Sequence, residues 1–467
     1  MLGLFNTLGL GARALQANQL GVEVTGQNLA NSSNAAYSRQ RVTLATSTAM
    51  QTTLGMQGTG VQATSIQQVR DALLDGQMRD ESSVTGYWNS QQSSLQNAQG
   101  QLGEYLNING TNSASDAQGL SDRLNNLFNS FQGLSTSPTS ISQRQNVIGQ
   151  AQALASGLND ASTKLSSLND SLNSSVTDSV TQANQLLTQI ANLNDQIAKA
   201  SLSGGTANDL TDTRQQALES LAGLVNIQTN TNSDGTVDVS VGGTQLVAGN
   251  KTLDSLQSYD PGNGQMQVRT TTGGTPLTLT GGSIQGTIDA RDGALKTLRD
   301  GLDTLASSLA TQVNGVYSSG YDLNGGTGAA FFTGNTAGTI AVNTALAADP
   351  SLLQASGVSG ATGDNTVALA LAKLGTQSVA ALGNKTFSGA FAAQVGSFGF
   401  ALSNANSEVA NQGAVTTMLK NQRDSVSGVS IEEEVANLML FQQAYSASSK
   451  IISTADQMLQ TVIALKT

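Results

Sequence analysis

Apolar residues in the C-terminal stretch from Ser430 to about Leu465 follow a seven-residue repeat. Large side chains occupy one position of each repeat, and a second, weaker row begins four residues later. The first row holds Ile431, Leu438, Tyr445, Ile452 and Leu459, and the second holds Val435 and Ile463. A repeat sustained over more than four heptads predicts a helix that pairs with another helix in a coiled coil.

The start of this helix is also marked in the sequence. Ser430 is followed three residues later by Glu433, which is the pattern of a capping box. Glu432, Glu433 and Glu434 place negative charge at the positive end of the helix dipole. Helix-end electrostatics therefore explains the three carboxylates without invoking a site.

The N-terminal stretch, from Met1 to about Ala30, has the same period. Its apolar row consists of Leu8, Leu15, Val22 and Leu29. Two helices with matching rows at opposite ends of one chain predict that the termini pair as a rod. Asn28, Asn31 and the polar residues that follow favour caps and turns, and they end the helix.

These two helices carry very few charges. Arg13 and Glu23 are the only charged residues from position 1 to 38, and Lys450, Asp456 and Lys466 are the only ones from 435 to the end. A coiled coil in water normally carries charges outside its seam. We therefore expect other copies of the chain to cover the outer faces, as in a polymer.

Between the ends, periodicity predicts mainly helices, with strands in two segments. Residues 40–66 and 226–286 show the short alternations and glycine turns of β-structure. The expected helices span residues 66–106, 120–131, 140–199, 288–316, 367–374 and 387–426. Residues 323–349 are expected to form a glycine-rich loop with short strands.

This order predicts a mainly α protein of nested, discontinuous domains. Residues 1–65 with 427–467 would form a terminal coiled-coil polymerisation rod. Residues 66–225 with 287–426 would form a long-helix bundle, and 226–286 an inserted, distal β-rich domain.

The composition argues against several classes of function. The net charge of −11 argues against a nucleic-acid partner, and no apolar stretch is long enough to cross a membrane. Cysteine and histidine are absent, which removes thiolate and imidazole chemistry. The N-terminus lacks the basic region of a cleavable signal peptide.

Candidate ligand motifs are weak. Residues 9–14 match a dinucleotide fingerprint formally, but they lie on a heptad helix with no preceding strand. Asp322 and Asn324 begin a calcium-like loop whose twelfth position is Thr333 instead of glutamate. We expect no enzyme activity, no cofactor and no metal.

Tyr37 and Arg39 stand out in the polar break after the first helix. Tyr37 could anchor the loop on its own domain. Alternatively, the pair could contact another copy, because aromatic and arginine side chains often anchor interfaces.

Residues 25–31 (Thr-Gly-Gln-Asn-Leu-Ala-Asn) and 37–40 (Tyr-Ser-Arg-Gln) resemble the N-terminal signature of bacterial flagellar axial proteins. The second block is similar to that of the hook-associated, hook–filament junction branch of this family. Further blocks agree in family order, at residues 209–214, 224–227, 281–292, 321–325, 331–332, 427–434, 442–447 and 452–456. One departure is Asn34-Ala35-Ala36, where the family has Thr-Pro-Gly.

The resemblance implies a structural subunit that leaves the cell through the flagellar type III apparatus without a cleavable signal. It would assemble on the hook as a homo-oligomeric, ring-like zone, with hook protein, a second junction protein and filament cap or flagellin as neighbours. An export chaperone would bind the C-terminal helix at Leu438, Tyr445, Ile452 and Leu459. The alternatives are a hook or rod subunit, or a secreted enzyme carried on the flagellum.

Overall fold

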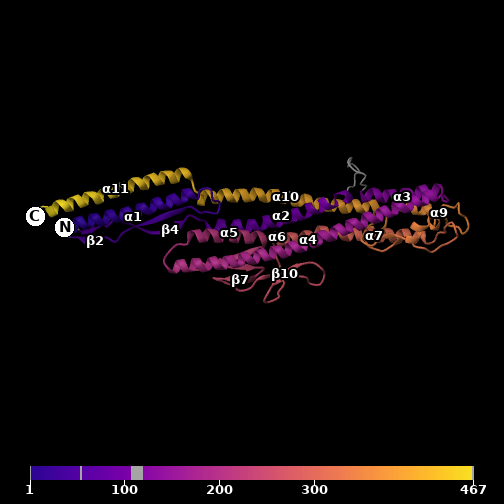
Figure 1. Ribbon diagram of the computed structural model, residues 1–467, viewed down its shortest axis with the longest axis horizontal. Helices are drawn as coiled ribbons and strands as arrows, with labels where there is room; N and C mark the ends of the chain where they lie inside the picture. Colours follow the sequence, from indigo (N-terminus) through magenta and orange to yellow (C-terminus); the bar gives the residue numbers. More distant parts are fainter. Residues whose placement is uncertain (1, 53–54, 107–118, 465–467) are drawn as a thin grey trace.

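The computed structural model describes residues 2–52, 55–106 and 119–464. The molecule is elongated, and both chain ends lie at the same end of it (Figure 1). There α1 (Leu2–Ala30) and α11 (Ile431–Ala464) run antiparallel along each other. Strands β1 (Gln40–Thr46) and β4 (Val61–Gln68) form an antiparallel pair against α1, and β2 (Met50–Thr52) pairs with β3 (Gly55–Gln57). We call α1, β1–β4 and α11 the rod, and residues 71–427 the body.

Small residues bring α1 and α11 into close contact. A Cβ atom added to Gly21 would lie 2.6 Å from the Phe441 ring, and one added to Gly11 would lie 2.8 Å from Ile452 Cγ1. Asn18 Nδ2 donates to Ser448 Oγ at 3.3 Å between them. Glycine permits this approach because it has no side chain at the crossing.

The seam between the two helices differs from the predicted one in its second row. In that row Val435 is 38% exposed and Ile463 65%, and in the first row Ile431 is 55% exposed and Tyr445 38%. The residues of α11 that face α1 lie about one turn from the first row. They are Glu434, Phe441, Ser448 and Ala455. The first row is half-covered at Leu438, Ile452 and Leu459. The prediction misplaced the second row because it followed the larger apolar side chains, whereas the contact is made largely by small and polar ones.

The body is built on α4 (Ile141–Leu202), which runs along most of its length (Figure 1). Ser140 caps this helix by accepting a hydrogen bond from the Gln143 backbone N–H. Helices α2 (Ala72–Leu106), α3 (Leu120–Thr136), α5 (Asn208–Leu224), α6 (Gly282–Ala290), α7 (Lys296–Tyr317) and α10 (Phe387–Ser427) pack around it or on one another. A π-helical turn at Arg291–Leu295 joins α6 to α7.

Far from the termini, the body ends in short elements and loops. They are β11 (Phe332–Thr333), β12 (Ala341–Val342), α8 (Thr344–Ala348), α9 (Thr366–Leu374) and 3-10 turns at Pro350–Leu352 and Ala380–Leu382. Phe131, Phe331 and Phe391 are fully buried in the large apolar core of this half, which α3, α4, α7 and α10 share.

The β-rich segment lies along the side of α4 instead of at the far end (Figure 1). Strands β5 (Ile227–Thr231), β6 (Val237–Val241), β7 (Thr244–Ala248) and β8 (Lys251–Thr252) form an antiparallel sheet, and β9 (Leu256–Tyr259) pairs with β10 (Gln267–Thr270). Val239 and Val247 are buried in one core with Val180 of α4 and Leu221 of α5. The strands therefore complete a helical core, and the predicted distal position is wrong.

The structure also corrects two predictions about helices. The helix expected from residue 66 begins at Ala72, because 61–68 belong to β4. Helix α5 was not expected, and its N-terminal residues contact the loop that follows α1. The expected end of the last helix at Leu465 lies outside the described residues.

Candidate functional site

Asn28 is the centre of a buried polar cluster in the rod. Its side chain is 1% exposed, and its amide makes four hydrogen bonds. Nδ2 donates to the Gln40 carbonyl at 2.8 Å and to Glu434 Oε2 at 3.0 Å. Oδ1 accepts from the Tyr37 hydroxyl at 2.8 Å and the Gln40 N–H at 2.9 Å. This one amide therefore joins α1, the loop, β1 and α11.

Glu434 is the charged member of this cluster, and it is only 2% exposed. Arg39 Nε lies 2.8 Å from its Oε1, and Arg39 Nη1 lies 2.6 Å from Glu433 Oε2. The Glu433 N–H donates to Ser430 Oγ at 3.4 Å, so half of the capping box is present. Helix-end electrostatics alone was therefore an incomplete explanation, because the carboxylate of Glu434 is a buried ion-pair partner.

Tyr37 is held within its own chain. Its hydroxyl donates to Asn28, and burial, with help from Asp209, Asp212 and Glu434, raises the pKa of the phenol to about 12. These contacts match the loop-anchor interpretation of Tyr37. A contact of Tyr37 or Arg39 with another copy stays a prediction.

A second set of polar contacts connects the rod and its flanking segments to the first five residues of α5. Asp212 Oδ2 accepts from the Ser38 N–H at 3.1 Å, and its Oδ1 lies 3.0 Å from Arg70 Nη1. Burial raises the pKa of the Asp212 carboxyl, against the opposing effect of these partners. Gln40 Nε2 donates to Asp209 Oδ1 at 3.1 Å. Sequence reasoning noted residues 209–214 only as a family-like block and assigned them no role.

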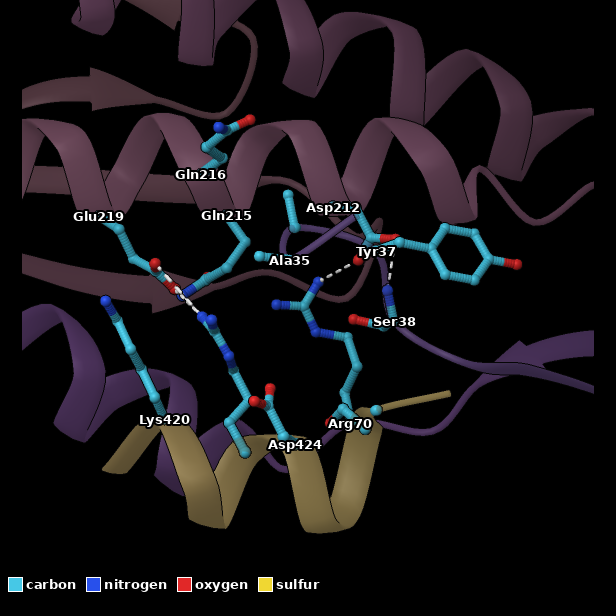
Figure 2. Close-up of a pocket in the computed structure, with 14 residues that line it drawn as sticks. Ala35, Tyr37, Ser38, Arg70, Asp212, Gln215, Gln216, Glu219, Lys420 and Asp424 are labelled. Carbon is cyan, nitrogen blue, oxygen red and sulfur yellow. Dashed lines mark hydrogen bonds and ion pairs between the residues drawn. The ribbon is translucent and has the colours of Figure 1, made fainter. Parts of the chain in front are cut away.

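Open space lies on both sides of the loop at residues 35–38. A cleft of about 250 Å³ separates α5 from the end of α10, with Lys420 and Asp424 on its far wall (Figure 2). A second cleft of about 490 Å³ lies between Asn31 and α5. Arg423 bridges the first cleft to Glu219 at 3.3 Å. Arg70 pairs with Asp212 beside the same cleft, and in the described residues no group of three or more acidic side chains is placed to hold a metal ion.

The other predicted interface residues lie along the rod. Leu8, Leu15, Val22, Leu29 and Asn31 are half-buried, and Asn31 donates only locally, to the Gln27 carbonyl. Helix α11 exposes many apolar side chains. Its largest exposed side chains are Ile431, Val435, Met439, Leu440, Tyr445, Ile451, Met458, Val462 and Ile463. No helix in the described ranges has the length and apolarity that a bilayer crossing requires.

Comparison with known proteins agrees with this architecture. Residues 106–332 match the profile of the flagellar hook-associated protein FlgK helical domain. Residues 420–465 match the C-terminal profile of flagellar basal body rod FlgEFG proteins. Flagellar hook-associated protein 1 of Bacillus subtilis is 29% identical over 509 aligned positions, covering 99% of this chain and 98% of the relative. Its Escherichia coli counterpart is 25% identical, over 97% and 98%.

A solved structure shows the same fold. The flagellar hook junction protein FlgK from Burkholderia pseudomallei superposes with a TM-score of 0.65 at 19% identity, over 75% of this chain and all of that one. Paired terminal helices and the two profile matches define a component of the bacterial flagellum. Residues 106–332 thus match the helical domain of flagellar hook-associated protein FlgK, and the chain is similar to flagellar hook-associated protein 1 over nearly its whole length.

Proposed function

We propose that this chain is a structural, non-enzymatic subunit that assembles on the tip of the flagellar hook and joins the hook to the filament. The outer face of the rod carries the proposal. Leu440 is 61% exposed, Met458 50% and Phe5 59%, on helices with very few charges. A large exposed apolar face marks a surface that another protein covers. Copies of the same chain would cover it in a ring-like zone, with the body facing outward.

Export through the flagellar type III apparatus is part of this proposal. A chain with an apolar outer rod needs protection before assembly, and an export chaperone on α11 would supply it. The predicted chaperone row of Leu438, Tyr445, Ile452 and Leu459 lies at the edge of the contact with α1. Tyr445 is 38% exposed in the folded chain, whereas the other three are half-buried. The chaperone would therefore bind α11 before α1 docks along it.

Hook protein, a second junction protein, and filament cap or flagellin are the proposed neighbours. The names of the relatives support the hook as one of them, since they are hook-associated proteins and a hook junction protein. A hook or rod subunit is the second candidate. The match of residues 420–465 to basal body rod proteins favours it, but covers only the C-terminal helices.

Immunogold labelling of isolated flagella tests the proposed position. Antibodies against the body are expected to label one narrow zone between hook and filament. Label distributed along the hook would identify a hook subunit, and label at the base would identify a rod subunit. Both of these patterns would contradict the junction role. Flagella from a strain without the gene provide the control for antibody specificity.

A further inference from the structure

We propose that the outer side of α10, with the adjacent edge of α2, is a contact surface for the body of a second copy of this chain. We call this surface the α10 face. Its large apolar members are Val84 on α2 and Phe400, Val415 and Met418 on α10. The inference rests on the proposed function, because it names the neighbour of the body within the same assembly. The terminal helices contribute no residue to the α10 face.

Helix α10 carries apolar side chains on two sides. Phe391 and Phe398 on its inner side are buried in the large core of the body. Phe400 is 76% exposed and Met418 54%, and neither belongs to an apolar core cluster of the described residues. These two project from the same side, because Met418 follows Phe400 by about five helical turns. A helix with apolar residues all round is normally buried, so the outer side of α10 is expected to be covered by a partner.

Helix α2 extends the apolar surface beyond α10. Thr85 and Thr416 meet across the contact between the two helices, with their hydroxyl oxygens 3.2 Å apart. Val84 and Val415 each precede one of these threonines. Because α2 and α10 are antiparallel, both valines turn to the same side of the contact, and both are exposed. The α10 face is therefore continuous across two helices.

Charged residues are almost absent from this part of the body. Residues 82–103 of α2 contain none, and residues 387–419 of α10 contain only Glu408, which is half-buried. Helix α4 differs, because it exposes several carboxylates. They are Asp160, Asp170 and Asp178. The α10 face thus combines exposed apolar side chains with an almost uncharged surround.

This charge distribution favours a second copy as the partner. The chain has a net charge of −11, so two copies that meet through charged faces repel each other. The α10 face lets two copies approach without that repulsion. A basic partner would gain little from it, because the face offers almost no carboxylate with which to pair.

The α10 face is large enough for a specific interface. At 1.5 Å per residue, residues 387–419 of α10 span about 50 Å and residues 82–103 of α2 about 33 Å. With a helix diameter of about 10 Å, the two helices together offer about 800 Å². A specific interface buries about 800 Å² on each partner. The face therefore meets the requirement without any contribution from the terminal helices.

The place of α10 in the molecule supports the same partner. At the joint between rod and body, residues 428–430 connect α10 to α11, and both helices lie along one edge of the molecule (Figure 1). In the proposed assembly, neighbouring copies cover α11. Because the molecule is elongated, a neighbour that lies along α11 also passes α10.

Photo-crosslinking in assembled flagella tests the contact. The photoreactive residue p-benzoylphenylalanine replaces Met418 of the full chain in one strain and Phe400 in another. Both side chains are more than half exposed, so the larger group fits without disturbing the core. Flagella are isolated and irradiated, and mass spectrometry identifies the crosslinked peptide. Immunogold labelling of the same preparations records where the chain lies.

We expect a crosslinked dimer of this chain from both positions, joined to a peptide within residues 71–427 of the second copy. The dimer should be absent without irradiation. Crosslinks only to another flagellar protein, or no crosslink at all in flagella with a normally labelled junction zone, would overturn the contact and leave the junction role intact. Dimers in flagella that are labelled along the hook would support the contact and contradict the junction role.

Charge substitution provides a second test, which does not require a photoreactive group. Phe400→Asp with Met418→Asp should lower the number of hooks that carry filaments by about tenfold or more, because an unpaired carboxylate is costly in an apolar contact. The matched control is Leu202→Asp with Leu253→Asp, which changes two exposed leucines outside the α10 face. Circular dichroism of the purified chains checks that both variants fold. An equal number of filaments in the two variants would overturn the proposal.

Discussion

Cells that carry Met439→Asp together with Leu440→Asp are expected to be non-motile, although the variant chain folds. Both side chains are more than half exposed and lie outside the row of Glu434, Phe441, Ser448 and Ala455 that faces α1, so the substitutions leave the contact with α1 intact. In an assembled zone they would bury unpaired carboxylates against apolar neighbours. Such burial costs several kcal/mol per charge, about 3 or more. Spreading in soft agar and electron microscopy of the flagella provide the measurement.

A charge-matched control separates assembly from net charge. Ser167→Asp with Ser220→Asp adds two carboxylates to exposed positions of body helices. This variant is expected to swim like the parent. Circular dichroism of both purified variants checks that the helices are retained. Normal motility of the α11 variant would show that its outer face is not buried in the flagellum.

Asn28→Ala is expected to destabilise the rod by about 3 kcal/mol or more, the largest effect of a single substitution at the joint. The substitution removes both partners of the Gln40 backbone and the acceptor of the Tyr37 hydroxyl. Glu434 loses one partner while it remains buried. Buried polar groups without partners incur their full desolvation cost.

Hydrogen exchange locates this effect. Amides of α1 and α11 should lose protection in Asn28→Ala, whereas those of α4 and α7 should not, since the rod contributes nothing to the core clusters of the described body. Asn31→Ala is the control, because the Asn31 amide bonds only to the Gln27 carbonyl on the same helix. Its effect should stay within about 0.5 kcal/mol. Equal protection in Asn28→Ala and Asn31→Ala would contradict the role of the cluster.

Long helices were predictable because their apolar residues recur at a helical period over many turns. The seam between α1 and α11 was predictable only in its first row. Hydrophobic patterns favour rows of large side chains, whereas one partner in each close contact of the crossing is small: Gly21 packs against Phe441 and Gly11 against Ile452. Close packing through small residues leaves a weak signal in the sequence.

The joint was harder to predict because its contacts join distant parts of the chain. Ser38 and Asp212 are 174 residues apart, and no local period links them. Asn28 and Arg39 were recognised as interface candidates through their family-like motif. Their partner Glu434 was explained instead by its place at a helix end, which hid its burial. The sequence indicated that Asn28 and Arg39 take part in an interface, whereas only the fold shows that Glu434 is their common partner.

Electron microscopy of cells without this gene, with flagellin assayed in the culture medium, tests the junction role most directly. The proposed function predicts hooks without filaments and monomeric flagellin shed into the medium. Export would continue, but flagellin would have no surface on the hook on which to assemble. Intact filaments on the hooks would contradict it.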